Sequence, residues 1–287
     1  MPEKNSGDVA LPSRCAMNRD TSPDRQYLPV VMEQKTKQTQ KFYDESPLSD
    51  AEFRTGNSIL SSEAIQIEYS AMEGGKILDA GCGPGNVSFR IVSSAKNAHV
   101  VSMDISSVSV GMARKRLSLL DTSNLAQQVV GSVLEPPFCS RAFDFVISSG
   151  VVHHTREPFR ALSNLGKILK DGGKMYLSVY NRNSFYFPEF HTVGALARTV
   201  ERRGWGKSLD VFISLFGFLL RVLSRQGVEK AHVRRIFGDR YLTPVASFHT
   251  GDEIRKWCKL EGFRILKAGS CKFGTLIWFV VEKAGEK

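Results

Sequence analysis

The sequence predicts an α/β protein with a doubly wound, mostly parallel sheet of seven strands, helices on both faces and an inserted helical lid. Three observations support this fold class. Short apolar runs alternate with helix-like stretches over residues 76–180, the same rhythm returns near residue 250, and one basic stretch interrupts it. Strands that alternate with helices form parallel sheets with right-handed crossovers. The 287 residues give room for one such domain with an insertion or a tail.

The expected strands are short runs rich in apolar and β-branched residues, which is typical of strands buried on both faces. They are Lys76–Ala80, His99–Asp104, Gln127–Val130, Phe143–Ser148, Lys174–Tyr180, Phe263–Ala268 and Leu276–Glu282.

Helices are expected between these strands. They are Asn86–Ala95, Ser107–Leu120, Pro158–Leu169 and Thr250–Leu260. Thr250 with Glu253 three residues later indicates a capping box at the start of the last helix. The glycines in Asp171–Gly173 are expected to close the third helix, because glycine adopts the left-handed conformation that ends helices.

Five parts of the chain differ in composition. Residues 1–40 are polar and interrupted by prolines, which predicts a disordered or loosely attached arm. Residues 41–75 are expected to form cap helices and residues 76–181 the core of the sheet. Residues 182–248 are expected to form a basic helical insertion or lid, and residues 249–287 the last helix and the last two strands.

The charge is unevenly distributed. Lys and Arg number 39 against 29 Asp and Glu, a net charge of +10. Residues 182–240 hold 11 of the basic and 5 of the acidic residues, so this stretch carries +6 and the rest of the chain +4. An excess of this size indicates an anionic partner but says nothing about the fold.

The five cysteines are scattered and show no CxxC spacing, which argues against a disulfide scaffold and against a metal site. No basic region followed by an apolar core stands at the N-terminus, and no apolar run is long enough to cross a bilayer. We therefore expect a cytoplasmic protein, with peripheral membrane contact left open.

A glycine-rich bend follows the first strand. Gly81, Gly83 and Gly85 let the backbone turn tightly between strand and helix, and Asp104 ends the next strand 19 residues after Gly85. A carboxylate at that strand end can accept hydrogen bonds from both ribose hydroxyls, so the pattern predicts a nucleoside-bearing cofactor. A dinucleotide site would have a third glycine where this sequence has Asn86, which favours a ligand without a pyrophosphate.

The segment ILDAGCGPGN at residues 77–86 closely resembles motif I of class I S-adenosylmethionine-dependent methyltransferases. Asp104 falls where that family binds the ribose, and FDFVISSGVVHH and LKDGGKMYLSVYN resemble its later motifs. The nearest subgroup is the small-molecule, ubiquinone/menaquinone methyltransferase-like "type 11" group. The resemblance covers residues 76–180 and returns at 249–282. It implies a Rossmann-like fold and S-adenosyl-L-methionine as cofactor, and it leaves the acceptor open.

The resemblance also implies a set of cofactor-binding residues. Asp79, Gly81 and Gly83 would line the amino-acid and ribose end, Asp104 would hold the ribose and Ile105 would lie against the adenine. Where the family usually has an acidic residue for the adenine amino group, this sequence has a serine, whose hydroxyl or backbone would accept that bond. The full set is Asp79, Gly81, Cys82, Gly83, Gly85, Asp104, Ile105, Ser132, Val133 and Ser149.

Methyl transfer from a sulfonium depends mainly on aligning the acceptor and excluding water, so a base is needed only when the acceptor must lose a proton. His153 and His154 follow the fourth strand and are the catalytic candidates; a structural role in the loop is the alternative. His249 and Tyr43 are candidates for contact with the acceptor. For Tyr43, a role as a packed aromatic is the alternative to closing the pocket.

The insertion contains a strongly apolar helix at Leu209–Leu223. Its polar or small residues Asp210, Ser214, Gly217 and Arg221 fall on one stripe. Three roles stay open: a lid packed on the domain, a wall of an apolar acceptor pocket, and contact of residues 205–226 with an anionic membrane surface. A later basic cluster could hold a carboxylate or phosphate of the acceptor. Its residues are His232, Arg234 and Arg235.

Three functions compete. The leading one is methylation of a small-molecule or lipid-like acceptor, which could be anionic. A nucleic-acid (RNA) methyltransferase is favoured by the charge, but Ser148–Val151 lacks the Asn/Asp-Pro-Pro-aromatic motif of enzymes that methylate base amino groups. A non-catalytic protein that keeps the cofactor fold would not need Gly81, Gly83 and Asp104 together. The oligomeric state is not indicated.

Overall fold

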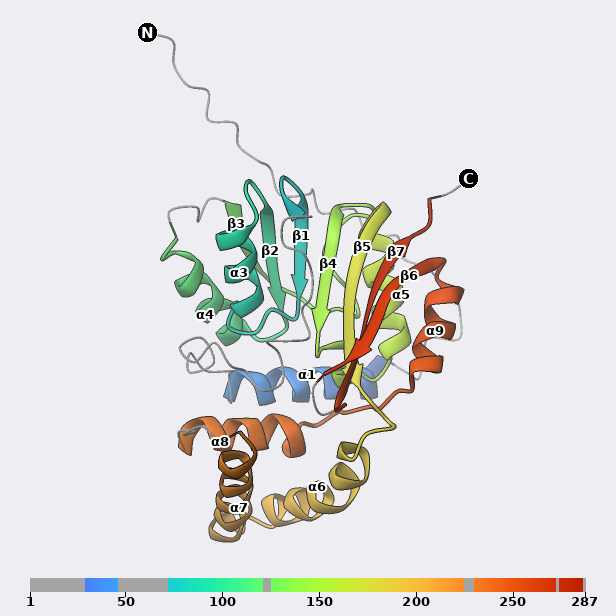
Figure 1. The fold of residues 1–287 in the computed structure, drawn as a ribbon. Helices are drawn as coiled ribbons and strands as arrows, with labels where there is room; N and C mark the ends of the chain where they lie inside the picture. Colours follow the sequence, from blue (N-terminus) through green and yellow to red (C-terminus); the bar gives the residue numbers. More distant parts are fainter. Residues whose placement is uncertain (1–28, 46–71, 121–124, 225–229, 272–273, 286–287) are drawn as a thin grey trace.

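The protein is a seven-stranded sheet with helices on both faces, seen in a computed structural model (Figure 1). The structure describes residues 29–45, 72–120, 125–224, 230–271 and 274–285. The strand order is β3-β2-β1-β4-β5-β7-β6, in which β1 to β5 run parallel and β7 is antiparallel to both neighbours. The strands are β1 Lys76–Ala80, β2 His99–Asp104, β3 Ala126–Val130, β4 Phe143–Ser149, β5 Leu169–Tyr180, β6 Phe263–Ser270 and β7 Leu276–Lys283.

The predicted fold class is confirmed, and each expected strand lies within a residue or two of its place, except for the start of β5. The helices are α1 Pro29–Glu45, α3 Asn86–Ser94, α4 Ser107–Leu117, α5 Pro158–Ile168, α6 Tyr186–Arg202, α7 Gly206–Ser224, α8 Lys230–Phe237 and α9 Gly251–Leu260, with short turns η4 Val152–His154 and η5 Gly238–Leu242.

The two faces of the sheet each bury an apolar layer, because side chains alternate along a strand. Leu78 of β1 packs with α5 and α9, whose apolar residues include Leu162 and Ile254. Ile77, one residue earlier, packs on the other face with Ile91 of α3. At the start of α9, Thr250 and Glu253 form the expected capping box.

The expected third helix, Pro158–Leu169, agrees with α5 to within one residue, but the prediction that Asp171–Gly173 closes it is wrong. Helix α5 already ends at Ile168, and β5 begins at Leu169, so Asp171–Gly173 lies within β5. Gly172 does adopt the left-handed conformation, with φ of 71°, but inside the irregular start of that strand. The register with β4 shifts between Phe143 and Phe145, which accommodates this irregularity.

The boundary of the expected N-terminal arm also needs correction. Helix α1 begins at Pro29, so the last twelve residues of the segment 1–40 are helical. Residues 1–28 and most of the expected cap helices, residues 46–71, lie outside the described residues. Figure 1 places α1 beyond the arrowheads of β1 and β4, across the carboxyl edge of the parallel strands.

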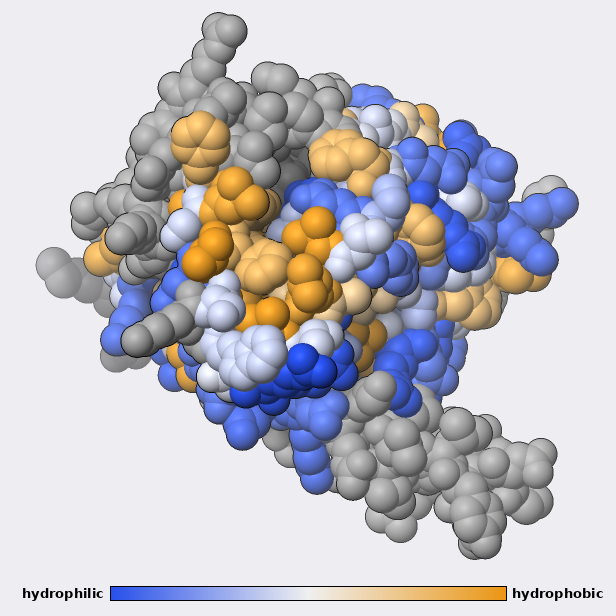
Figure 2. Space-filling view, turned by 90° about the horizontal axis from the view of Figure 1, so that it is seen from below, coloured by the Kyte–Doolittle hydropathy of each residue, from blue (hydrophilic) through white to orange (hydrophobic). Residues whose placement is uncertain are grey.

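The segment predicted as a lid, called the lid from here on, lies with its described residues 182–224 and 230–248 on the far side of α1 from the sheet (Figure 1). Helices α6, α7 and α8 and the turn η5 share their own apolar cluster, separate from the two layers of the sheet. Seen from that side, hydrophobic residues gather in the middle of the face, with hydrophilic residues below them and to their right (Figure 2). No helix in the described part of the chain is long and apolar enough to span a membrane.

Two residues of the polar and small stripe on α7, Asp210 and Gly217, contact α8. A Cβ atom built on Gly217 would come within 2.8 Å of Val233 Cγ1, so the absence of a side chain permits the close contact of α7 with α8. Asp210 forms an ion pair with Arg234 of α8. Arg234 of the expected basic cluster is therefore paired within the lid.

Candidate functional site

The glycine bend connects β1 to α3 through left-handed backbone. Gly81, Gly83 and Gly85 have φ values of 85°, 51° and 82°. The amides of Gly81 and Cys82 donate to the Met103 carbonyl of β2 at 2.7 and 2.9 Å, which fixes the bend against the neighbouring strand. Because L-residues with side chains rarely adopt such φ values, this path requires glycine.

Two of these glycines also permit close packing. A Cβ on Gly81 would lie 2.3 Å from Val151 Cγ2, in the loop after β4. A Cβ on Gly85 would lie 2.9 Å from Ala113 Cβ on α4. The bend is thus held between the β4 loop and α4. The spacing of the glycines in the sequence does not predict either contact.

Asp104 lies beside the bend, at the end of β2. Its Oδ2 accepts a hydrogen bond from the Gly83 amide at 2.8 Å, and its Oδ1 accepts one from the Ser106 amide at 2.9 Å. Burial raises the pKa of Asp104 above its ordinary value, and the two amide hydrogen bonds oppose that rise. The structure therefore brings together the carboxylate and the glycine bend that the sequence predicted as one site.

Asp79 is fully buried and faces α3. Its Oδ2 accepts hydrogen bonds from Ser88 N at 3.1 Å and Ser88 Oγ at 2.6 Å, and Ser102 Oγ donates to Ser88 Oγ at 2.7 Å. Burial raises the pKa of Asp79 to about 6, while the bonds from Ser88 lower it. Asp79 thereby anchors the first turn of α3 to β1.

The remaining expected cofactor residues lie along the same edge. Ile105 follows Asp104 directly and is half-buried. Ser132 Oγ accepts from the Leu134 amide at 3.2 Å, and Val133 is buried in the core.

Cys82 is buried, and burial raises the pKa of its thiol well above the usual value. Ser149, at the end of β4, lies near Ser178 of β5, whose Oγ accepts from the Gly150 amide at 2.9 Å. The expected cofactor residues therefore follow the ends of four neighbouring strands, β3, β2, β1 and β4.

The two adjacent histidines differ in their surroundings. The ring of His153 is fully buried at 3.9 Å from the Tyr180 ring, and neither ring nitrogen has a hydrogen-bond partner within the described residues. Burial lowers the pKa of His153 well below its ordinary value, so the ring is neutral. His154 Nδ1 lies 2.9 Å from the Val245 carbonyl. A carbonyl only accepts, so Nδ1 carries a proton, and in this tautomer of imidazole Nε2 is the acceptor.

The structure gathers His249 and Tyr43 around this pair. Ser247 Oγ donates to the His153 carbonyl at 3.1 Å and lies 2.9 Å from His249 Nε2. Burial lowers the pKa of His249. Tyr43 of α1 lies with its ring 6.2 Å from that of His154 and donates its hydroxyl to Asp239 Oδ1 at 3.1 Å. Burial raises the pKa of Tyr43 well above 10, so it stays protonated.

Sequence reasoning missed two residues that tie α1 and the lid to this site. Asp44 Oδ1 accepts from Ser106 Oγ at 2.6 Å, directly beside Asp104. Tyr180, at the end of β5, contacts the rings of His153, His154 and Tyr186. The position of Tyr180 at the end of an expected strand is the one sequence feature that points to the site. No sequence pattern indicates that Asp44 contacts Ser106.

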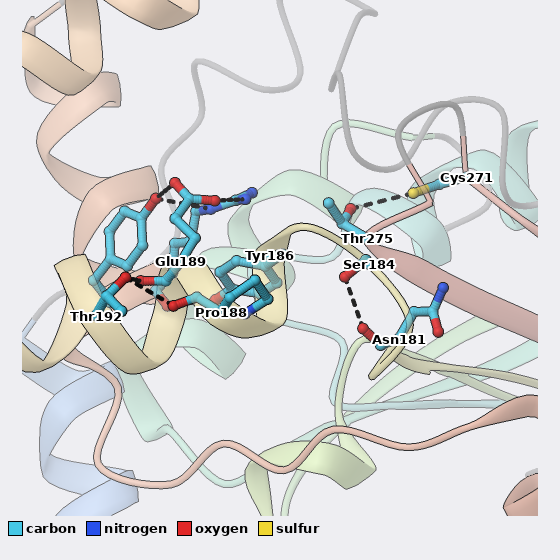
Figure 3. Close-up of polar contacts among 10 residues, drawn as sticks. Asn181, Ser184, Tyr186, Pro188, Glu189, Thr192, Cys271 and Thr275 are labelled. Carbon is cyan, nitrogen blue, oxygen red and sulfur yellow. Dashed lines mark hydrogen bonds and ion pairs between the residues drawn. The ribbon is translucent and has the colours of Figure 1, made fainter.

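Two sets of polar contacts hold the lid in place, one among its own helices and one between its first residues and the turn before β7. Glu189 on α6 accepts from Arg240 at 2.9 Å and from Tyr241 (Figure 3). At the entrance to the lid, Ser184 Oγ donates to the Asn181 carbonyl (Figure 3). The Asn181 side chain donates to the Gly274 carbonyl at 2.8 Å. The lid is thus attached both to its own helices and to the turn before β7. Within the described ranges, no three His, Cys, Asp or Glu side chains are grouped as a metal site would require.

The sheet core is similar to known methyltransferase sequences. A family model described as "Methyltransferase domain" matches residues 78–177. The ubiquinone/menaquinone biosynthesis C-methyltransferase UbiE of Roseobacter denitrificans is 28% identical over 124 residues, which are 43% of this chain and 49% of that protein. The chain spans about half the length of the curated relatives it matches.

Solved structures share the fold across nearly the whole chain. A putative methyltransferase in complex with the Trm112 methyltransferase activator of Haloferax volcanii superimposes with a TM-score of 0.60 and 14% identity, covering 87% of this chain and 99% of that one. Magnesium protoporphyrin IX methyltransferase (ChlM) of Synechocystis PCC 6803, solved with bound SAH, gives a TM-score of 0.52 and 18% identity over 91% of this chain and 98% of that one.

Proposed function

We propose that the protein is a class I S-adenosylmethionine-dependent methyltransferase that methylates a small-molecule or lipid-like acceptor by in-line displacement. The match of residues 78–177 to a methyltransferase-domain model supports this proposal. The observation that supports this most strongly is the 2.8 Å hydrogen bond between Asp104 Oδ2 and the Gly83 amide. It joins the carboxylate suited to a ribose and the bend suited to close backbone approach at one edge of the sheet.

The residues present fit S-adenosylmethionine. Each oxygen of Asp104 uses one lone pair on a backbone amide, which leaves accepting capacity for the two ribose hydroxyls. The left-handed bend at Gly81–Gly85 would contact the amino-acid end, with Cys82 within it. Ile105, Ser132 and Val133 would border the adenine. Asp79 would act as a positioning residue, because its carboxylate holds Ser88 at the start of α3.

When bound, the cofactor supplies a methyl group on a positively charged sulfonium, which is already an activated leaving group. The chain's task is to align the acceptor behind that methyl and to exclude water. Ser149, at the end of β4, would border the methyl-donating end, and α1 and the lid would cover it. Tyr43, kept protonated by burial, would close the site with its ring while its hydroxyl stays bonded to Asp239.

Of the two adjacent histidines, His154 is the better candidate for a base. Its Nδ1–H is held by the Val245 carbonyl, which leaves Nε2 available to accept a proton from an acidic acceptor. His153, buried and neutral with unpartnered ring nitrogens within the described residues, would instead line the pocket beside Tyr180. His249, linked to His153 through Ser247, would border the acceptor on the lid side.

The test uses cofactor carrying a labelled methyl group, incubated with the protein and an extract. Label entering the organic phase, or a small molecule in the aqueous phase, supports the proposal. Label that precipitates with nucleic acid would favour the RNA methyltransferase instead. Label that enters no fraction, although the protein binds cofactor, would indicate a non-catalytic role.

A pair of histidine variants tests the assignment of the base once an acceptor is found. His154→Gln should lower kcat by roughly 10²–10⁴-fold if the acceptor must lose a proton, without changing cofactor affinity. His99→Gln, at the opposite edge of the sheet at the start of β2, is the matched control and should leave both unchanged. Equal activity of the two variants would remove His154 from the chemistry.

A further inference from the structure

The lid exposes apolar side chains that its own packing leaves uncovered. Six of the twelve large apolar side chains exposed in the described parts of the chain fall within only 26 residues of α6, α7 and the turn between them. We call these the apolar surface: Val193, Leu196, Trp205, Val211, Leu215 and Phe218.

Helix α7 is apolar on two sides. Leu209 and Ile213 are buried in the cluster of the lid, and Gly217 packs against α8. Val211, Leu215 and Phe218 are spaced i, i+4 and i+7, so they form a second stripe, and they are 67%, 59% and 62% exposed. A helix in a soluble domain normally directs polar residues to solvent, so an exposed apolar stripe of this length indicates a contact surface.

Basic side chains border the apolar surface. Arg202 and Arg203 are exposed at the end of α6, and the Arg203 guanidinium lies 5.2 Å from the centre of the Trp205 ring. Residues 182–240 carry 11 Lys/Arg and 5 Asp/Glu, a net charge of +6. The ion pairs Glu189–Arg240 and Asp210–Arg234 each neutralise one acid and one arginine, so this excess of positive charge is unchanged by them.

We propose that the apolar surface of α6 and α7 docks on an anionic lipid bilayer, with the apolar side chains inserted at the headgroup boundary and the arginines on lipid phosphates. Amphipathic helices of this kind insert shallowly, by about 5–10 Å, and tryptophan prefers that depth. Each Lys or Arg near an anionic leaflet strengthens binding about fivefold. Since no described helix can span a membrane, the contact is peripheral.

The charge distinguishes a bilayer from a second copy of the chain. In a self-contact through this surface, each copy would contribute the basic side chains of Arg202 and Arg203 to the same interface, and like charges in proximity repel. An anionic bilayer instead complements both the apolar stripe and its basic border. The proposal concerns the surface alone and does not depend on the acceptor or on methyl transfer.

Vesicle co-sedimentation tests the proposal with the full chain. Vesicles of equal parts phosphatidylglycerol and phosphatidylcholine should bind the protein, and added salt should weaken that binding, because surface electrostatics are screened. Vesicles of phosphatidylcholine alone should bind it at least ~10-fold more weakly. Equal binding to both, or binding to neither, would overturn the proposal.

Matched variants locate the contact. Leu215→Ser with Phe218→Ser should lower vesicle binding at least ~10-fold, since two apolar side chains are lost from the inserted face. Leu260→Ser, an equally exposed leucine on α9, should leave it unchanged. Arg202→Gln with Arg203→Gln should lower binding roughly 30-fold on anionic vesicles only. The control for charge is the pair Lys256→Gln with Lys259→Gln on α9.

All these side chains are exposed, so circular dichroism and the thermal midpoint should stay unchanged. A lid pair no weaker than its α9 control would overturn the proposal. So would a wild-type dimer in light scattering that Leu215→Ser with Phe218→Ser dissociates, because the surface would then be an interface between copies.

Discussion

Replacing Gly81 with alanine should destabilise the protein more than any alanine placed at an open glycine. The reason is the bend itself, which combines a left-handed φ of 85° with direct contact to the loop after β4. The new Cβ would meet Val151 Cγ2 at 2.3 Å and Cγ1 at 2.7 Å, which is far inside van der Waals contact. Either the bend or the β4 loop must shift.

The magnitude follows from two independent penalties. The left-handed conformation costs a residue with a Cβ about 1–2 kcal/mol. Overpacking of a close contact costs typically about 1–3 kcal/mol. Gly81→Ala should therefore lower the free energy of unfolding by about 2–5 kcal/mol, which urea unfolding at constant m would measure. Cofactor affinity should fall as well, because the bend carries the amide that meets Asp104.

Gly74 provides the matched control. It has a φ of 67°, and nothing lies within 4 Å of its would-be Cβ. Gly74→Ala should therefore lose only the conformational part, about 1–2 kcal/mol. In the double variant Gly81→Ala with Val151→Ala, the removed methyls should relieve part of the clash, and the double-mutant cycle should give a favourable coupling. Equal losses for Gly81→Ala and Gly74→Ala, or no coupling with Val151, would refute the reasoning.

Three further predictions use titration and capping. Burial raises the pKa of Asp79 from 3.8 to about 6, so the folded state favours the protonated carboxyl. The free energy of unfolding should therefore fall by about 3 kcal/mol as pH rises from about 4 to about 6. The Asp79→Asn variant should lack that fall, and a variant with the pH profile of the wild type would contradict the prediction. For His153 the sign is opposite: its pKa is lowered, so stability is lost as pH falls below about 6.5, and His153→Gln should be less sensitive to acid in the same titration. Thr250→Ala should cost about 1 kcal/mol by removing the cap of α9, measured as a lower urea midpoint; an unchanged midpoint would mean that the capping box contributes nothing.

The sheet and the bend were predictable because their signals are local. Apolar runs mark strands buried on both faces, and Asp104 was expected beside the bend because parallel strands end at a common edge. The start of β5 was not predictable in the same way. Asp171–Gly173 has the composition of a helix stop, and it lies within β5 because Leu169 and Lys174 on either side of it pair with Phe143 and Phe145 of β4.

Contacts between distant segments explain the other differences. Helix α1 is rich in Lys, Thr and Gln and shows no apolar period, but Tyr43 bonds to Asp239, 196 residues away, and Asp44 bonds to Ser106. Nothing local encodes either partner. Likewise, helical spacing predicted a polar stripe on α7 but could not show that Gly217 meets Val233 on α8. Periodicity identifies a face, whereas the neighbour of that face depends on tertiary packing.

Titration calorimetry of S-adenosylmethionine, with the wild type and Asp104→Ala side by side, tests the central claim most directly. The wild type should bind with micromolar-scale affinity, and Asp104→Ala should bind about 1–3 kcal/mol more weakly, because a charged hydrogen-bond acceptor is lost from the bend. Asp144→Ala, which removes a carboxylate at the start of β4, is the control and should bind like the wild type. Absence of binding by the wild type at millimolar cofactor, or equal affinity of the Asp104 variant, would contradict the assignment.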